Sequence, residues 1–190
     1  MNLLFLVALT GAAGIPSDTT LLMRGLVVGT ETCTPRGSHL EFHTGFEFVR
    51  KVDLTAKVEL AGGRIRSLLV SGQGYPWQSK VSPFPVGLLA LRASEWEKEG
   101  RPSGSIHSCG SRCFVLEDLT WGRSFVWLGD DGSLSSAFVP TPFAPLVALP
   151  KGRESEYVSV LEAAARAGLE SVSLPSSAGA LAIREPTLSM

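Results

Sequence analysis

The segment Leu40 to Leu60, LEFHTGFEFVRKVDLTAKVEL, decides the fold. Its odd-numbered positions carry most of the charged and polar side chains, and its even-numbered positions are mostly apolar. The apolar even positions are Leu40, Phe42, Phe46, Phe48, Val52, Leu54, Ala56, Val58 and Leu60. Because successive side chains of a strand point to opposite faces, this period of two predicts β-strands with one buried and one solvated face.

The segment is too long to be a single strand of an ordinary domain, since a strand rises about 3.3 Å per residue. We therefore predict two paired antiparallel strands with a turn near Arg50-Lys51. Ala61-Gly62-Gly63 predicts the next turn, and Arg64 to Ser71 the next strand. Upstream, Leu21 to Thr32 predicts one more strand, so the first half of the chain is expected to form a sheet of about four strands.

The hydrophobic period changes between Val86 and Lys98. Leu88, Leu89, Arg92 and Trp96 recur there at helical spacing, and a glycine and a proline follow the segment. We predict a helix over Val86–Lys98 that packs against the sheet.

The second half of the chain returns to strand patterns. Phe114 to Leu119 predicts a strand, and 124–128 with 133–139 predicts a hairpin whose turn contains Asp131-Gly132. The proline-rich run 140–145 is expected to end further strand pairing.

A second helix is predicted from Arg153 to Gly168, with Tyr157, Leu161, Ala164 and Ala165 on one face. The fold class that these elements predict is α+β, a curved and mainly antiparallel β-sheet with two packed helices. It is expected to occupy residues 20–170 as one β-rich domain.

Length and composition restrict the function classes. A chain of 190 residues with 44% hydrophobic residues is long enough for one domain with a substantial core. Its formal net charge is −1, so no overall positive field attracts nucleic acid, and we predict no nucleic-acid partner.

The amino terminus has the pattern of an export signal. Leu3 to Leu9 is an apolar run, and small residues and Pro16 follow it. We predict that residues 1–17 are a signal peptide and that the protein is exported to the periplasm or the extracellular space. The alternative is a buried first strand. The run is too short for a membrane span, and no transmembrane segment is predicted.

The cysteines and histidines form no recognisable metal motif. Cys109 and Cys113 are close enough in sequence to form a disulfide, although two reduced thiols fit equally well, and Cys33 remains over. Zinc needs three or four ligands, and only His107 lies near the cysteine pair. His39 and His43 would be separated by about 13 Å along a strand.

No group of residues matches a catalytic motif. The Gly-x-Ser-x-Gly turn of serine hydrolases is missing from the sequence, and the Asp130-Asp131 pair has a full explanation as a hairpin turn. We therefore assign no catalytic, metal-binding or cofactor-binding residue and predict no cofactor.

Aromatic residues provide the candidate interface. The large aromatic side chains outside the alternating segment are Tyr75, Trp77, Trp96, Trp121 and Trp127. Tryptophan and arginine are common anchors of interfaces, so Trp121, Arg123 and Trp127 are the predicted interface or ligand face. The alternative is that these rings simply pack in the core or at its rim.

Four motifs follow one another between Leu40 and Leu169. They are the alternating strands with Val52-Asp53-Leu54-Thr55-Ala56, the helix from Ser82-Pro83 to Glu99-Gly100-Arg101-Pro102, the hairpin with Leu119-Thr120-Trp121-Gly122-Arg123, Val126-Trp127-Leu128 and Asp131-Gly132, and the helix with Glu156-Tyr157. This order resembles the β-rich region that precedes the catalytic barrel in exported, metal-dependent amidohydrolases.

Residues 171–190 are expected to be a linker followed by the start of another module. Leu181 to Arg184 resembles the first strand of the amidohydrolase module, and Glu185 to Met190 departs from it. The resemblance implies a non-catalytic accessory or interaction domain whose partner is an amidohydrolase barrel module. The barrel and its metal-binding histidines lie outside the resemblance, so no catalytic residue is carried over.

Two other functions fit the same sequence. One is a stand-alone exported carrier that binds an apolar ligand between the concave face of the sheet and the helix Val86–Lys98, with Phe42, Phe46 and Phe48 on that face. The other is an enzyme whose site leaves no motif.

Overall fold

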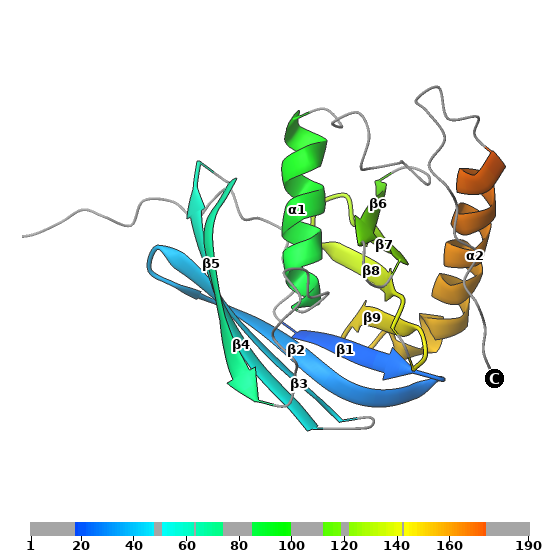
Figure 1. Cartoon of the computed structure of the whole chain (residues 1–190), viewed down its shortest axis with the longest axis horizontal. Helices are drawn as coiled ribbons and strands as arrows, with labels where there is room; N and C mark the ends of the chain where they lie inside the picture. The colour runs from blue at the N-terminus through cyan, green and yellow to red at the C-terminus, as the bar shows by residue number, and fades with distance from the viewer. Residues whose placement is uncertain are drawn as a thin grey trace, which may run out of the picture.

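The computed structural model describes residues 18–47, 51–62, 64–73, 85–99, 112–118, 122–141 and 143–173. The elements are β1 (Asp18–Met23), β2 (Leu26–Arg36), β3 (His39–Glu47), β4 (Lys51–Ala61), β5 (Arg64–Gln73), α1 (Val86–Glu99), β6 (Cys113–Asp118), β7 (Gly122–Leu128), β8 (Leu134–Val139), β9 (Leu146–Pro150), the 3₁₀ turn η1 (Glu154–Glu156) and α2 (Tyr157–Ser173). All nine described strands form one antiparallel sheet of order β5-β4-β3-β2-β1-β9-β8-β7-β6 (Figure 1). The predicted α+β class is confirmed.

The predicted strand pair is β3 and β4. Leu40 pairs with Val58 and Phe42 with Ala56, so the even-numbered residues of both strands share one face. These four side chains are almost fully buried. The turn expected near Arg50-Lys51 lies partly outside the described residues.

The prediction of one strand from Leu21 to Thr32 was wrong, because this segment is the hairpin β1–β2. Arg24 and Gly25 form its turn with φ values of 52° and 77°. Two consecutive positive φ values match the twist that a two-residue hairpin requires. The pair Arg-Gly lacks the asparagine or aspartate that usually marks such a turn, and for this reason the sequence pattern missed it.

The expectation that the prolines of 140–145 end strand pairing was also wrong. Strand β9 follows them and pairs with both β8 and β1, so it joins the two halves of the sheet. Residues Leu146 to Leu149 are fully buried. The prolines precede this run and leave its backbone N–H groups intact, so the strand forms directly after them.

Helix α1 has nearly the predicted bounds and lies on the concave face of the sheet (Figure 1). Its buried residues Val86, Ala90 and Ala93 pack with side chains from both halves of the sheet. The main core cluster around the helix includes Leu21, Met23, Val52, Leu54, Phe114, Val126, Leu128, Leu134, Ala137, Val139, Leu146 and Ala148. The sheet therefore wraps around α1, and the helix forms the centre of the core.

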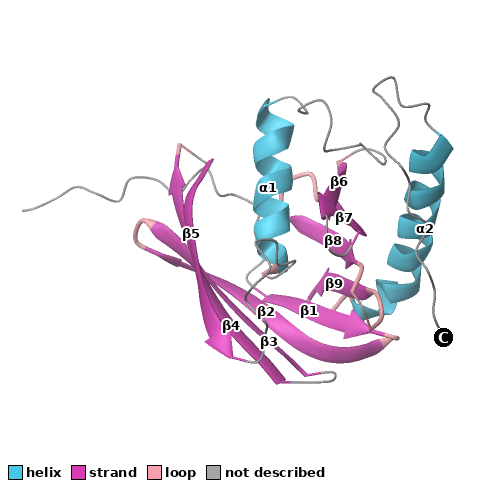
Figure 2. Ribbon diagram, viewed as in Figure 1, coloured by secondary structure: helices cyan, strands magenta, loops and turns pink. Residues whose placement is uncertain are grey.

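Helix α2 covers the opposite face of strands β1 and β9 to β6 (Figure 2). It continues to Ser173, so Gly168 lies inside the helix and does not end it as predicted. The buried positions are Val160, Ala164 and Ala167, whereas Ala165, which was expected on this face, is exposed. Among the described helices, none covers the outer face of β2 to β5 (Figure 2).

The close approach of α1 to the sheet predicts opposite effects for two helical glycines. A Cβ atom at Gly87 would overlap the Phe42 ring and lie 3.1 Å from Oε1 of Glu31, whereas one at Gly168 would meet nothing within 4 Å. Gly87→Ala should lower the free energy of unfolding by about 1–3 kcal/mol through overpacking. Gly168→Ala, the matched control, should raise it by about 0.5–1 kcal/mol through helix propensity. Urea unfolding of both variants measures this, and a stabilised Gly87→Ala variant would contradict the packing of α1.

Candidate functional site

Arg123 and Trp127 lie on β7, and the third predicted interface residue, Trp121, lies outside the described residues. Both described residues have the same parity in the strand as Phe125, and Trp127 packs against the cluster that contains Ala164 and Ala167 of α2. The Trp127 ring stacks on that of Phe125 with centroids 6.0 Å apart. The structure therefore gives Trp127 a packing role between the sheet and α2, while Arg123 is half-buried beside it in the strand.

The other aromatic candidates do not join this group in the part of the chain that the structure describes. Trp96 belongs to α1 and packs, partly buried, against the core cluster on the opposite side of the sheet. Tyr75 and Trp77 lie outside the described residues.

The two histidines of β3 lie apart from each other, and His107 is outside the described residues. Nε2 of His43 is 3.7 Å from Oδ1 of Asp53, and both side chains are more than half exposed. Such an exposed pair contributes little to stability. Within the described ranges, no group of three or more His, Cys, Asp or Glu side chains could hold a metal ion.

The cysteines differ in state. Cys113 is disulfide-bonded and Cys33 is free, while Cys109 lies outside the described residues. Burial, and after it the charge of Glu31, raises the pKa of the Cys33 thiol to about 12. Cys33 is therefore protonated at neutral pH and is a poor nucleophile.

The acidic pair Asp130-Asp131 lies in the β7–β8 turn, as predicted. Oδ1 of Asp131 accepts a hydrogen bond from the backbone N–H of Ser133 at 2.9 Å. Hydrogen bonds from Ser133 lower the pKa of Asp131, so this carboxylate is charged and stabilises the turn.

Glu31 is the functional group that the sequence patterns missed. It lies on β2 at an inward-facing position and is almost fully buried. Its carboxylate accepts hydrogen bonds from the backbone N–H groups of Val86 at 2.8 Å and Gly87 at 2.6 Å, and from the Thr44 hydroxyl at 2.8 Å. A side chain of the sheet thus caps the first turn of α1.

The location of Glu31 follows from strand register and helix chemistry. Thr44, its cross-strand neighbour on β3, is the polar exception among the even-numbered residues of that strand. The first N–H groups of a helix have no partner within the helix and carry a partial positive charge. A buried carboxylate opposite these N–H groups accepts their hydrogen bonds and balances their partial positive charge. A polar Thr44 among the apolar even-numbered residues was the one sequence feature that could have indicated a buried polar partner on the neighbouring strand.

Burial is the dominant influence on the acidity of Glu31. Desolvation raises its pKa above the ordinary value of 4.5, against the opposing hydrogen bonds from Gly87, Thr44 and Val86. The charged form is therefore less favourable in the folded protein than in the unfolded chain.

A second carboxylate ties the other end of α1 to the sheet. Glu95 is buried, accepts a hydrogen bond from the backbone N–H of Ile65 and forms an ion pair with Arg92 at 3.0 Å. Glu99 extends this link through an ion pair with Arg64 at 2.6 Å. The attachments at the two ends of α1 are separated by about 12 Å along the helix axis, too far for the two carboxylates to act on one reacting atom.

The comparisons with known proteins add no family: no family, no curated protein and no solved structure matches the chain. None of the described helices is long and apolar enough to cross a membrane. The described site is thus an anchored helix inside a curved sheet.

We predict a pH-dependent effect of Glu31→Gln. The substitution places an amide NH₂ group where a buried carboxylate oxygen accepted a bond, and should cost about 1–3 kcal/mol. Because the pKa of Glu31 is raised in the folded state, its contribution is greatest below its unfolded pKa and is lost as pH rises through the folded pKa. Urea unfolding at about pH 4 and about pH 8 should show a larger difference between wild type and variant at the lower pH. A difference that grows with pH would contradict this.

Trp127→Ala tests the packing role of the aromatic group. The truncation removes the stacking on Phe125 and the packing against the clusters beneath α2, and should lower the free energy of unfolding by about 3 kcal/mol. Leu26→Ala is the control, because Leu26 is 68% exposed and its loss should change stability by less than about 0.5 kcal/mol. An unchanged stability of Trp127→Ala would instead favour a role in association.

Proposed function

We propose that the chain is a non-catalytic accessory domain that binds an amidohydrolase barrel module in an exported enzyme. The observation that carries this proposal is the attachment of α1 to the sheet at both ends, through Glu31 and Glu95. The concave face is thereby part of the core, and the outer surface is what the domain offers to other molecules.

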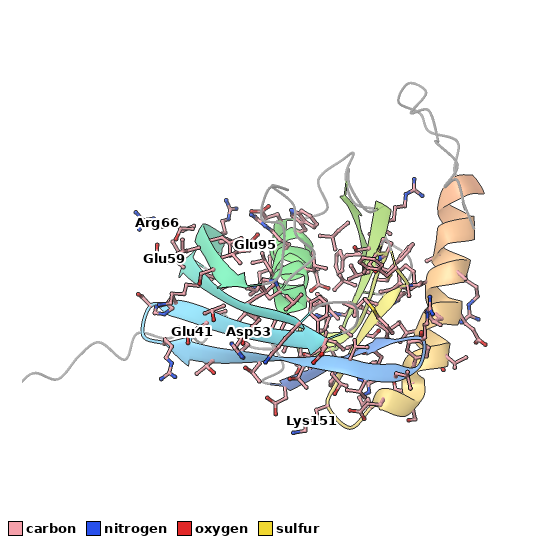
Figure 3. All side chains as sticks on the ribbon, turned by 60° about the horizontal axis from the view of Figure 1, so that its bottom comes forward. Glu41, Asp53, Glu59, Arg66, Glu95 and Lys151 are labelled. Carbon is pink, nitrogen blue, oxygen red and sulfur yellow. The ribbon has the colours of Figure 1, made fainter. Side chains whose placement is uncertain are left out.

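The order of elements supports the resemblance on which the proposal rests. The strand pair β3–β4, helix α1, the hairpin β7–β8 and helix α2 occur in the sequence positions of the four motifs. The outer face of β3 and β4 carries charged side chains, with Lys57 and Glu41 3.9 Å apart across the two strands. Figure 3 shows two of the acidic side chains of this half of the sheet, Glu41 and Asp53. A face of mixed charge suits a solvated contact with a second module.

Export is supported by cysteine chemistry. Disulfides persist in oxidising compartments such as the periplasm and the extracellular space, and Cys113 is disulfide-bonded. This agrees with the export signal predicted for residues 1–17.

The alternative function, an exported carrier, is less well supported. Its apolar ligand would lie between the concave face and α1, where Val86, Ala90 and Ala93 already pack against the strands. A ligand could enter only if α1 moved away from the Glu31 carboxylate. The buried N–H groups of Val86 and Gly87 would then lose their hydrogen-bond acceptor.

The test is co-expression of the full chain with the amidohydrolase barrel encoded nearest to it in its genome. Size-exclusion chromatography with light scattering should show a complex, and zinc-dependent amide hydrolysis should occur only in samples that contain the barrel. Hydrolysis by the chain alone, or a barrel that does not bind it, would overturn the proposal. Native mass spectrometry of the chain alone is the control for the carrier: a co-purified lipid would favour that function.

A further inference from the structure

Strand β5 is an edge of the described sheet, and its only described strand neighbour is β4 (Figure 1). An edge strand presents backbone N–H and C=O groups that can pair with another strand. Proteins commonly protect such edges with short length or charge. The opposite edge, β6, has six residues and ends in Glu117-Asp118, whereas β5 has ten residues and no charged residue from Ser67 to Gln73.

The polar links between α1 and β5 that the described residues show lie at the first residues of the strand. Glu95 accepts the N–H of Ile65, and Glu99 pairs with Arg64. Figure 3 shows Arg66 near Glu59 at the same end of the strand pair. Beyond this end, Leu68 is 44% exposed and Leu69 is 67% exposed. Within the described ranges, no other strand pairs with the outer edge of β5, and this edge strand carries exposed leucines.

The sequence of β5 is complementary to itself. Ser67-Leu68-Leu69-Val70-Ser71 has the same order of chemical types in both directions, with Leu69 at the centre. In an antiparallel pair, residues that lie opposite each other have their side chains on the same face. A two-fold axis through Leu69 would place Leu69 against the partner's Leu69, Leu68 against the partner's Val70 and Ser67 against the partner's Ser71.

This register also fits the two faces of the sheet. Leu68 and Val70 pair with Val58 and Ala56 of β4, so they share the inward face of the sheet. Leu69 pairs with Lys57 on the outer face. Pairing centred on Leu69 would therefore join the apolar inner rows of two copies, and Arg66 would lie opposite the partner's uncharged Gly72. A register centred on Leu68 would instead place Arg66 against Val70 and Ser67 against Leu69.

We propose that β5 pairs antiparallel with β5 of a second copy of this chain, in the register centred on Leu69, so that one sheet continues through the dimer. The contact involves about seven residues of each copy and is small, so its dissociation constant should lie in the micromolar range. This self-association is independent of the proposed amidohydrolase partner, because it needs only the chain itself.

A charge-exchange experiment tests both the dimer and its register. The two Leu69 side chains would face each other, so Leu69→Glu and Leu69→Lys should each repel their own copy and be monomeric. An equimolar mixture of the two variants should dimerise, because glutamate then lies opposite lysine. Sedimentation velocity up to about 200 µM detects association in this affinity range. Leu69→Glu should fold normally, since the new carboxylate lies beside Lys57, and circular dichroism checks this for each variant.

Leu26→Glu is the matched control, because Leu26 is 68% exposed and lies on β2, away from this edge. It should dimerise as the wild type does. A monomeric wild type at every concentration, or a Leu69→Glu variant that still dimerises, would overturn the proposal. A mixture of the Glu and Lys variants that stays monomeric would overturn the register centred on Leu69.

Discussion

The buried carboxylate of Glu31 is the interaction on which the structure depends. It lies on a central strand and accepts hydrogen bonds from the first two backbone N–H groups of α1. The Thr44 hydroxyl donates a third hydrogen bond to it. Burying a carboxyl group is costly, as the raised pKa of Glu31 indicates, and the hydrogen bonds from the start of the helix offset part of this cost. The helix and the carboxylate therefore need each other, and this mutual need determines where α1 begins on the sheet.

The two halves of the sheet acquire different surroundings from this arrangement. Strands β6 to β9 and β1 lie between the two helices, with α1 on one face and α2 on the other. Strands β2 to β5 pack against α1 on their inner face only, and among the described helices none covers their outer face. Strand β9 is apolar throughout because helices cover both of its faces. Strands β3 and β4 alternate because a helix covers only one of theirs. Within the described residues, the sheet face that no helix covers is the outer face of β2 to β5.

Sequence patterns predicted the elements whose side chains face two different environments. The alternation of β3 and β4 and the helical spacing of α1 are strong for this reason, and the Asp131-Gly132 turn carried its own chemical signal. The β1–β2 turn was missed because Arg24 is an unusual residue at a positive φ value. Strand β9 was missed because a strand covered on both faces has no alternation and follows prolines.

The candidate site could be predicted only in part, because its key contacts link residues that are distant in sequence. Glu31 and Val86 are separated by 55 positions, and neither segment alone indicates the hydrogen bond between them. For Trp127 the sequence correctly predicted a strand, whereas Arg123 was left just outside the predicted segment 124–128, and the packing of α2 on Trp127 required the fold. Trp121 lies outside the described residues.

Helix α1 begins against the concave face beside Glu31, with Gly87 in contact with the ring of Phe42. Nuclear Overhauser spectroscopy of the isotope-labelled chain measures this contact directly. Strong cross-peaks are expected between the ring protons of Phe42 and the α-protons of Gly87. If the Phe42 ring instead shows contacts only to strand residues, or to a co-purified ligand, α1 does not fill the sheet and the account is contradicted.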